Sequence, residues 1–147
     1  MSKKTMCLID VDQTLANSAP YLHLYEHRRL FEWERSMQKH ECFEDVKGLV
    51  NRLYDEGHMI VIATARDARA ETYAWLLNNG IKFDRLHTGI LQRSTPWCEL
   101  GVVKRQLFEK VYKDNYELFL VVDDQKSVID AFKDIASTFQ VNPQGLK

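Results

Sequence analysis

The chain of 147 residues has a size that suits one ordinary globular domain. Hydrophobic residues make up 45% of it and charged residues 28%, a composition typical of a protein with a normal core and a hydrated surface. The formal net charge of −1 provides no global positive field, which argues against long-range attraction of extended nucleic acid. We therefore expect one compact domain over residues 1–147.

The cysteines and the first residues indicate the expected compartment. Cys7, Cys42 and Cys98 are odd in number and form no CxxC pair, so we expect reduced thiols and not a disulfide framework. The apolar stretch before Asp10 is too short for a signal peptide or a membrane span. These features favour a cytoplasmic protein without a membrane partner.

The first half of the chain alternates between strand and helix patterns. The apolar run at residues 6–9 predicts a buried strand that ends at Asp10. Residues 21–39 predict one helix, with Leu30, Trp33 and Met37 on one face. Residues 43–56 form a clearer helical pattern that Gly57 ends, and HMIVIAT at 58–64 predicts a second buried strand.

The second half continues the alternation. Asp67 is placed to cap a helix in which four residues are expected on the buried face: Ala70, Tyr73, Ala74 and Leu77. A short strand at 85–88, a loop at 89–99 and a helix at 100–112 follow. The run ELFLVV at 117–122 predicts a third strong strand, followed by a helix at 127–136 and a last strand at 138–141.

This order of elements predicts an α/β fold. Strands that alternate with helices favour a parallel sheet of about five strands with helices on both faces, a Rossmann-like three-layer sandwich. Right-handed crossovers bring the carboxyl ends of all the strands to one edge, where open α/β sheets bind ligands. Three strong strands deliver polar residues to that edge: Asp10 and Asp12, Thr64 and Arg66, Asp123 and Asp124.

The acidic residues at this edge need a positive partner. Asp10 and Asp12 are two positions apart, and Asp123 and Asp124 are adjacent in sequence. Carboxylates held close together repel one another unless a cation lies between them. A divalent cation and a phosphate-bearing substrate are the two candidates that fit such a cluster.

Four short motifs follow in a fixed order: DVDQT at 10–14, Thr64 after IVIA, Lys104 in VVKRQLF, and VVDD ending at 124. Together they resemble the four motifs of the haloacid dehalogenase superfamily, and the resemblance extends from residue 5 to about 141. It implies a Mg²⁺-dependent phosphatase. A second acid such as Asp12 is absent from the dehalogenases of that superfamily, so its presence favours phosphate ester hydrolysis.

The resemblance also implies roles for these residues. Asp10 corresponds to the nucleophile that forms an aspartyl-phosphate, and Asp12 to the general acid and base. Thr64 and Lys104 correspond to groups that bind the phosphoryl oxygens. The implied Mg²⁺ ligands are oxygens of Asp10, Asp123 and Asp124, together with the backbone carbonyl of Asp12.

A closer resemblance is to the 3′-phosphatase domain of phage polynucleotide kinase-phosphatases, in which an Arg that follows motif II contacts the substrate. Arg66 is the matching position, and ATAR at 63–66 carries the likeness. The chain departs from this group at Gln13, where the group has Gly, and we expect no kinase half. The resemblance implies a phosphorylated nucleic-acid end or a nucleotide as substrate.

The size of the lid is a further expectation. Residues from about 17 to 40 have room only for a small helical insert, which predicts a minimal cap and an open site. Aromatic side chains there and in the 89–99 loop could stack on a base or pack in the core: Tyr21, Tyr25, Trp33 and Trp97. Arginines could contact phosphates or lie on a solvated face: Arg28, Arg29, Arg66 and Arg93.

Three other interpretations stay open at this point. Within the same chemistry, the chain could be a 5′-nucleotidase or another small-molecule phosphatase. From a different class, a signalling receiver domain also uses Asp, Thr and Lys, but its phospho-accepting Asp follows the third strand, whereas DVD here follows the first. A catalytically silent binding module is the third alternative, and the presence of every motif residue argues against it.

Overall fold

The computed structural model describes residues 3–92 and 95–142. Its centre is a five-stranded parallel sheet in the order β5-β4-β1-β6-β7. The strands are β1 (Lys4–Ile9), β4 (Met59–Ala63), β5 (Arg85–His87), β6 (Tyr116–Asp123) and β7 (Ser137–Gln140). The α/β fold with a central parallel sheet of five strands is therefore confirmed.

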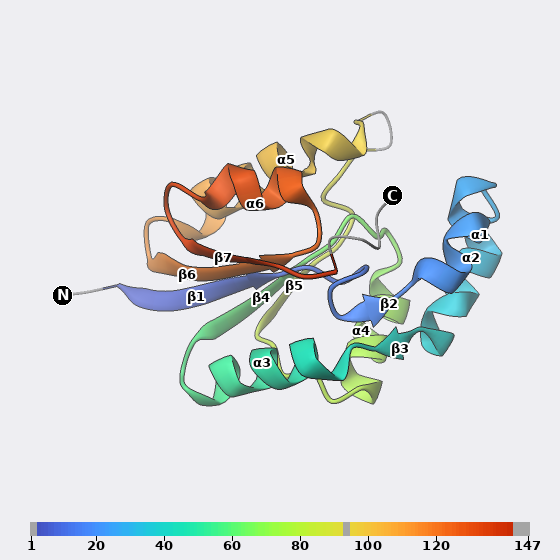
Figure 1. Ribbon diagram of the computed structural model, residues 1–147, viewed down its shortest axis with the longest axis horizontal. Coiled ribbons are helices and arrows are strands. Elements are labelled where there is room, and N and C mark those ends of the chain that lie inside the picture. The colour runs from blue at the N-terminus through green and yellow to red at the C-terminus, as the bar shows by residue number, and fades with distance from the viewer. Residues whose placement is uncertain (1–2, 93–94, 143–147) are drawn as a thin grey trace.

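Helices cover both faces of the sheet, and each face has its own core. The helices α5 (Leu100–Leu107) and α6 (Lys126–Phe132) lie on one side, and α3 (Glu44–Asp55) and α4 (Arg69–Asn78) on the other (Figure 1). Alternate β1 residues point to opposite faces: Met6 and Leu8 pack in the α5–α6 core, while Cys7 and Ile9 pack in the α3–α4 core. The central strand is therefore buried on both sides, as its continuous apolar sequence predicts.

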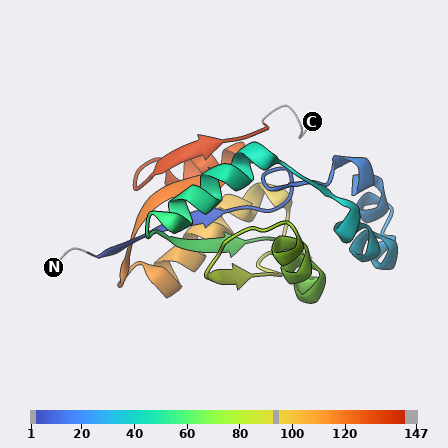
Figure 2. The same ribbon diagram turned by 90° about the horizontal axis from the view of Figure 1, so that it is seen from below.

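A small insert follows β1 and lies beyond the carboxyl ends of the strands (Figure 2). It consists of β2 (Ala16–Asn17), η1 (Ala19–Tyr21), α1 (Leu22–Glu26), α2 (Leu30–Ser36), η2 (Met37–Lys39) and β3 (Glu41–Cys42). β2 and β3 pair in antiparallel fashion and close the insert at its base. Gln38 attaches it to α4 by donating a hydrogen bond of 3.0 Å to the carbonyl of Glu71.

Several predicted elements differ in detail from the structure. The single helix predicted over 21–39 is wrong, because the chain breaks between α1 and α2 at Arg28, whose φ of +58° lies in the left-handed region. The predicted cap by Asp67 is also wrong, since α4 begins after Ala68 and no side chain caps it. The predicted helix at 100–112 is α5 followed by a π-helical turn, η4 (Phe108–Tyr112).

The buried face of α4 is not the predicted one. Tyr73 and Leu77 are exposed, whereas Trp75 and Leu76 are fully buried. Both sets of positions satisfy helical spacing, so the periodicity alone cannot choose between them. The indole of Trp75 decides the rotation of the helix, because it fills the core and its N–H donates a hydrogen bond of 2.9 Å to the carbonyl of His40.

Candidate active site at the carboxyl edge of the sheet

Polar residues from three strands meet at the carboxyl ends of β1, β4 and β6. Asp10 follows β1, Thr64 follows β4, and Asp123 ends β6. A cavity of about 310 Å³ lies at this edge, and its polar lining includes Asp10, Asp12, Thr64 and Asp124. Apolar and aromatic side chains complete its wall: Leu22, Tyr25, Ala65, Trp97 and Leu100.

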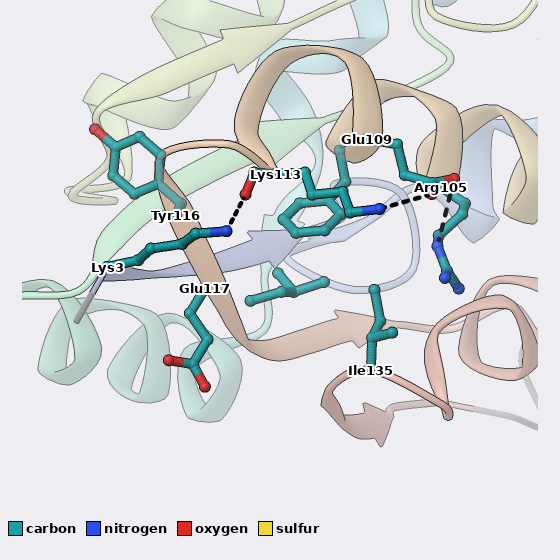
Figure 3. Close-up of a pocket in the computed structure, with 9 residues that line it drawn as sticks. Lys3, Arg105, Glu109, Lys113, Tyr116, Glu117 and Ile135 are labelled. Atoms are coloured by element: carbon teal, nitrogen blue, oxygen red, sulfur yellow. Dashed lines mark hydrogen bonds and ion pairs between the residues drawn. The ribbon is translucent and has the colours of Figure 1, made fainter. Parts of the chain in front are cut away.

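A cavity of similar size, about 300 Å³, lies at the opposite end of the sheet (Figure 3). Lys3 precedes β1 there, and Tyr116 and Glu117 begin β6. Its charged groups are partly engaged with one another, since Glu109 lies 3.6 Å from Arg105 and 3.8 Å from Lys113. No member of the acidic cluster lines it, so the carboxyl edge is the better candidate site.

Lys104 is the buried cation of the site. Its Nζ lies 3.0 Å from Oδ1 of Asp10 and 2.7 Å from Oδ2 of Asp123, and its side chain is 1% exposed. The lysine lies on α5, which packs closely against α6 at Gly101. The two carboxylates raise the pKa of Lys104 despite its burial, which would by itself lower that pKa, so the lysine stays charged.

The acidic cluster contains Asp10, Asp123 and Asp124, all buried, with one oxygen from each within 4.8 Å of the others. Burial, followed by the charge of Asp123, raises the pKa of Asp10 to about 6. Burial and the charges of Asp10 and Asp123 also raise the pKa of Asp124. Lys104 therefore does not balance three carboxylates, and a second positive charge would fit among them.

The two oxygens of Asp123 already have partners. Oδ2 receives the Lys104 ammonium, and Oδ1 accepts a hydrogen bond of 3.0 Å from the backbone N–H of Gln125. Asp10 accepts a further hydrogen bond of 3.1 Å from the hydroxyl of Thr14, through Oδ2. The acid whose oxygens are least engaged in the cluster is therefore Asp124. A set of hard carboxylate oxygens of this kind suits Mg²⁺.

The carboxylate of Asp12 lies outside this cluster and pairs with Arg66. Nε and Nη2 of Arg66 donate hydrogen bonds of 3.0 Å and 2.6 Å to Oδ1 of Asp12. Burial acts to raise the pKa of Asp12, but the charge and hydrogen bonds of Arg66 outweigh it and hold that pKa below its ordinary value. The predicted substrate arginine, which is buried, and the predicted acid, whose side chain is partly exposed, thus form a hydrogen-bonded ion pair.

Thr64 and Gln13 shape the loops that carry these groups. The hydroxyl of Thr64 accepts a hydrogen bond of 3.2 Å from the backbone N–H of Arg66, which fixes the turn after β4. Gln13 has a φ of +61°, the left-handed region that favours the Gly of related sequences. Its Oε1 accepts bonds of 2.9 Å and 3.0 Å from the N–H groups of Ser18 and Ala19, so the side chain braces the start of the insert.

The aromatic and basic candidates divide into two groups. Tyr25 and Trp97 are 42% and 44% exposed and line the cavity, whereas Trp33 is buried and Tyr21 stacks on His40. Arg28 and Arg29 are exposed on the insert and do not line the cavity, and Arg29 pairs with Glu32. Arg93 lies outside the described residues.

The structure adds one residue that the sequence did not single out. His40 is buried at the end of the insert, and its Nδ1 lies 3.0 Å from Nη2 of Arg66. No local pattern could have revealed the contact, because 26 positions separate the two residues.

Comparison with known proteins places the chain in a family. The profile of the polynucleotide kinase PNKP phosphatase domain matches residues 4–145. The chain belongs to this family. It is thus a phosphatase domain of the haloacid dehalogenase type, and its family implies phosphomonoester hydrolysis. A comparison with curated proteins returns no match.

Solved structures share this fold at low sequence identity. A chain of the Pnkp1/Rnl/Hen1 complex superposes with a TM-score of 0.74 at 16% identity, covering 96% of this chain and 47% of that one. A chain of the Pnkp1/Rnl/Hen1 RNA repair complex gives a TM-score of 0.73 at 19% identity, with 96% and 43% covered. A hydrolase from Streptococcus pneumoniae TIGR4 gives 0.59 at 15% identity, with 97% and 96% covered. The chain thus spans less than half the length of the two Pnkp1 complex chains.

None of the helices in 3–92 and 95–142 is long and apolar enough to cross a membrane.

Proposed function

We propose that the chain is a Mg²⁺-dependent phosphomonoesterase that works through an aspartyl-phosphate and removes 3′-phosphates from nucleic-acid ends or nucleotides. The observation that carries the proposal is the buried acidic cluster of Asp10, Asp123 and Asp124, in which Lys104 pairs with the first two and leaves room for a second cation. The family to which the chain belongs supports the reaction class.

The proposed Mg²⁺ ligands are carboxylate oxygens of Asp10 and Asp124, the backbone carbonyl of Asp12, and Asp123 directly or through water. Asp124 is the best placed of the adjacent pair, because both oxygens of Asp123 have protein partners. When bound, Mg²⁺ would neutralise the crowded carboxylates and offset the negative charge of the phosphoryl group. The raised pKa values of Asp10 and Asp124 support this assignment.

In the proposed reaction, a carboxylate oxygen of Asp10 attacks phosphorus, and the bond from phosphorus to the ester oxygen breaks. Asp12 gives its proton to the departing oxygen, so the leaving group departs as an alcohol. Asp12 then accepts a proton from water as that water attacks phosphorus, which releases inorganic phosphate and restores Asp10. Lys104, Thr64 and Arg66 are the proposed partners of the phosphoryl oxygens.

The pairing with Arg66 favours one of the two forms that Asp12 needs. Because Arg66 lowers the pKa of Asp12, the carboxylate is held ionised, as the water-activating step requires. For the first step Asp12 must carry a proton. We therefore expect the negative charge of a bound phosphoryl group to raise the pKa of Asp12 while Arg66 keeps its carboxylate in place.

The shape of the cavity supports a nucleotide-like substrate. The partly exposed rings of Tyr25 and Trp97, whose centroids are 6.3 Å apart, line the same cavity as Asp10 and Thr64. Aromatic rings next to a phosphate site can stack on a base. The insert is small and does not form a large lid domain. A site without such a lid would suit the end of a polymer. The Pnkp1 chain in an RNA repair complex is a structural neighbour, which agrees with this substrate class.

The test is a substrate panel with the purified chain and Mg²⁺. We expect phosphate release from 3′-phosphorylated oligonucleotides to exceed release from 3′- and 5′-mononucleotides, and EDTA to stop it. Clear preference for 5′-mononucleotides would refute the 3′-end assignment and favour a nucleotidase. No hydrolysis of any phosphomonoester would refute the enzyme and favour a silent binding module.

The nucleophile is tested by a pair of matched substitutions. Asp10→Asn should abolish turnover. It should also abolish the aspartyl-phosphate, which in the wild type is trapped by acid quenching and recognised because hydroxylamine cleaves it. Asp130→Asn makes the same chemical change on the exposed side of α6, where Asp130 pairs with Lys126, and should leave turnover unchanged. Full activity in Asp10→Asn would show that another group attacks phosphorus.

A further inference from the structure

The end of the insert is connected to the site through His40. This residue is 3% exposed, and its ring stacks on Tyr21 with centroids 5.1 Å apart. Its backbone carbonyl accepts the hydrogen bond of Trp75 from α4. Its two ring nitrogens face different partners, Arg66 at Nδ1 and Ser36 at Nε2. The imidazole is thus held by contacts from the insert, from α4 and from the loop after β4.

The hydrogen bonds assign the tautomer of His40. The hydroxyl of Ser36 donates its single proton to the carbonyl of Trp33 at 2.6 Å, so toward His40 it acts as an acceptor. Nε2, 3.2 Å from that oxygen, therefore carries the proton. Arg66 can only donate, so Nδ1 must be the unprotonated acceptor. The imidazole is neutral in this arrangement, and burial together with the charge of Arg66 agrees, since they lower the pKa of His40 to about 4.

The guanidinium of Arg66 is held along two edges. Nε and Nη2 face Asp12, and Nη2 also reaches Nδ1 of His40. The ring of Trp33 lies 5.6 Å from the central carbon of the guanidinium. The side chain of Arg66 is 1% exposed, so it has no solvent to replace a lost partner. An apolar side chain at position 40 would leave a buried N–H of Arg66 without an acceptor.

We propose that His40 is a positioning residue of the phosphatase site: its neutral imidazole accepts a hydrogen bond from Arg66 and thereby holds the guanidinium edge-on to the carboxylate of Asp12. This inference rests on the proposed function, because it assigns His40 an effect on the acid that protonates the leaving group. It also gives the small insert a role, since the insert supplies the residue that fixes the geometry of Asp12.

The test uses two substitutions that differ in the acceptor. His40→Asn keeps an acceptor oxygen near the place of Nδ1, whereas His40→Leu removes it. On a 3′-phosphorylated oligonucleotide, whose alcohol leaves poorly, we expect His40→Leu to lower kcat/KM about tenfold, the loss that one hydrogen bond to a charged group supports. We expect His40→Asn to stay within about threefold of the wild type, since the bond to Arg66 is retained.

The leaving group separates positioning from a general loss of structure. 4-Nitrophenyl phosphate releases a good leaving group that needs little protonation, so His40→Leu should lower its kcat/KM much less. A merely structural role would lower the activity on both substrates equally. Trp75→Phe is the matched control, because it removes the bond to the carbonyl of His40 without touching Nδ1, and it should keep the wild-type ratio between the substrates.

Three results would overturn the inference. The first is wild-type activity on both substrates in a folded His40→Leu variant. The second is an equal loss on both substrates, or an equal loss in His40→Asn and His40→Leu. The third is a ¹⁵N NMR spectrum of the wild type that places the ring proton of His40 on Nδ1. This measurement does not depend on turnover. Failure of the proposed function would look different, since the wild type itself would then hydrolyse neither substrate.

Discussion

The close approach of α5 and α6 can be tested at one glycine. A Cβ added at Gly101 would lie 2.3 Å from the carbonyl oxygen of Ser127 and 3.1 Å from Cβ of Ala131. The nearest of these atoms is backbone and cannot rotate away. The two helices would have to separate by roughly 0.7 Å before this contact reached even 3.0 Å. Gly101→Ala therefore tests whether this packing limits stability.

The expected magnitude follows from two opposing effects. Alanine in a helix gains up to about 1 kcal/mol over glycine, while overpacking against a rigid neighbour costs about 1–3 kcal/mol or more. We expect Gly101→Ala to lower the free energy of unfolding by about 2 kcal/mol, and for a chain of this length to lower Tm by about 6 °C. Because α5 also carries Lys104, we expect phosphatase activity to fall at temperatures where the variant is folded.

Gly48 is the internal control. It lies within α3, and an added Cβ there meets no atom within 4 Å. Gly48→Ala should therefore raise the free energy of unfolding by about 1 kcal/mol through helix propensity alone. Thermal and urea denaturation followed by circular dichroism measure both variants. The reasoning is refuted if Gly101→Ala is as stable as the wild type while Gly48→Ala shows its expected gain.

Three further predictions concern the site. Lys104→Met should lower the free energy of unfolding by about 3–5 kcal/mol, because two buried carboxylates lose the cation between them; a loss below about 1 kcal/mol in urea denaturation would contradict this. Because the pKa of Asp10 rises from 3.8 to about 6 on folding, protonated Asp10 stabilises the metal-free protein fully below about pH 4, and this contribution is lost as the pH rises through 6. Urea denaturation across that range should show a smaller decline in Asp10→Asn, and an equal decline would show that other groups cause it. Gln13→Ala should lower the free energy of unfolding by about 2 kcal/mol, because the hydrogen bonds of the side chain are lost. Gln13→Gly loses the same bonds but should be about 1 kcal/mol more stable than Gln13→Ala, because glycine adopts the left-handed φ without strain. Equal losses in the two variants in thermal denaturation would argue against strain at this position.

The sequence was a good guide to elements but a poor guide to their rotation and breaks. The strands at 6–9, 58–64 and 117–122 were recognised because buried parallel strands are continuous apolar runs. The helical pattern over 21–39 continues through the break at Arg28, because this left-handed residue is not a glycine and leaves no mark in the sequence. The face of α4 was misassigned because two sets of positions fit the helical period equally well.

The candidate site shows the same division. Asp10, Thr64, Asp123 and Asp124 could be placed together from sequence, because each follows a strand and parallel strands end at one edge. The pairing of Lys104 with Asp10 spans 94 positions. Whether the two side chains meet depends on how α5 packs in the tertiary structure. Motif order predicted that Lys104 belongs to the site, but not that it bridges two carboxylates.

By itself, the sequence determined the α/β architecture, the edge of the sheet at which the candidate site lies, and the acidic character of that edge. These depend on local properties, namely the hydrophobic period and the residue type at each strand end. Only the tertiary structure decided that Arg66 pairs with Asp12 across 54 positions and that His40 holds Arg66 from the other side. Buried charges choose their partners by proximity after the chain has packed, and that proximity is set by the insert, α4 and the sheet together.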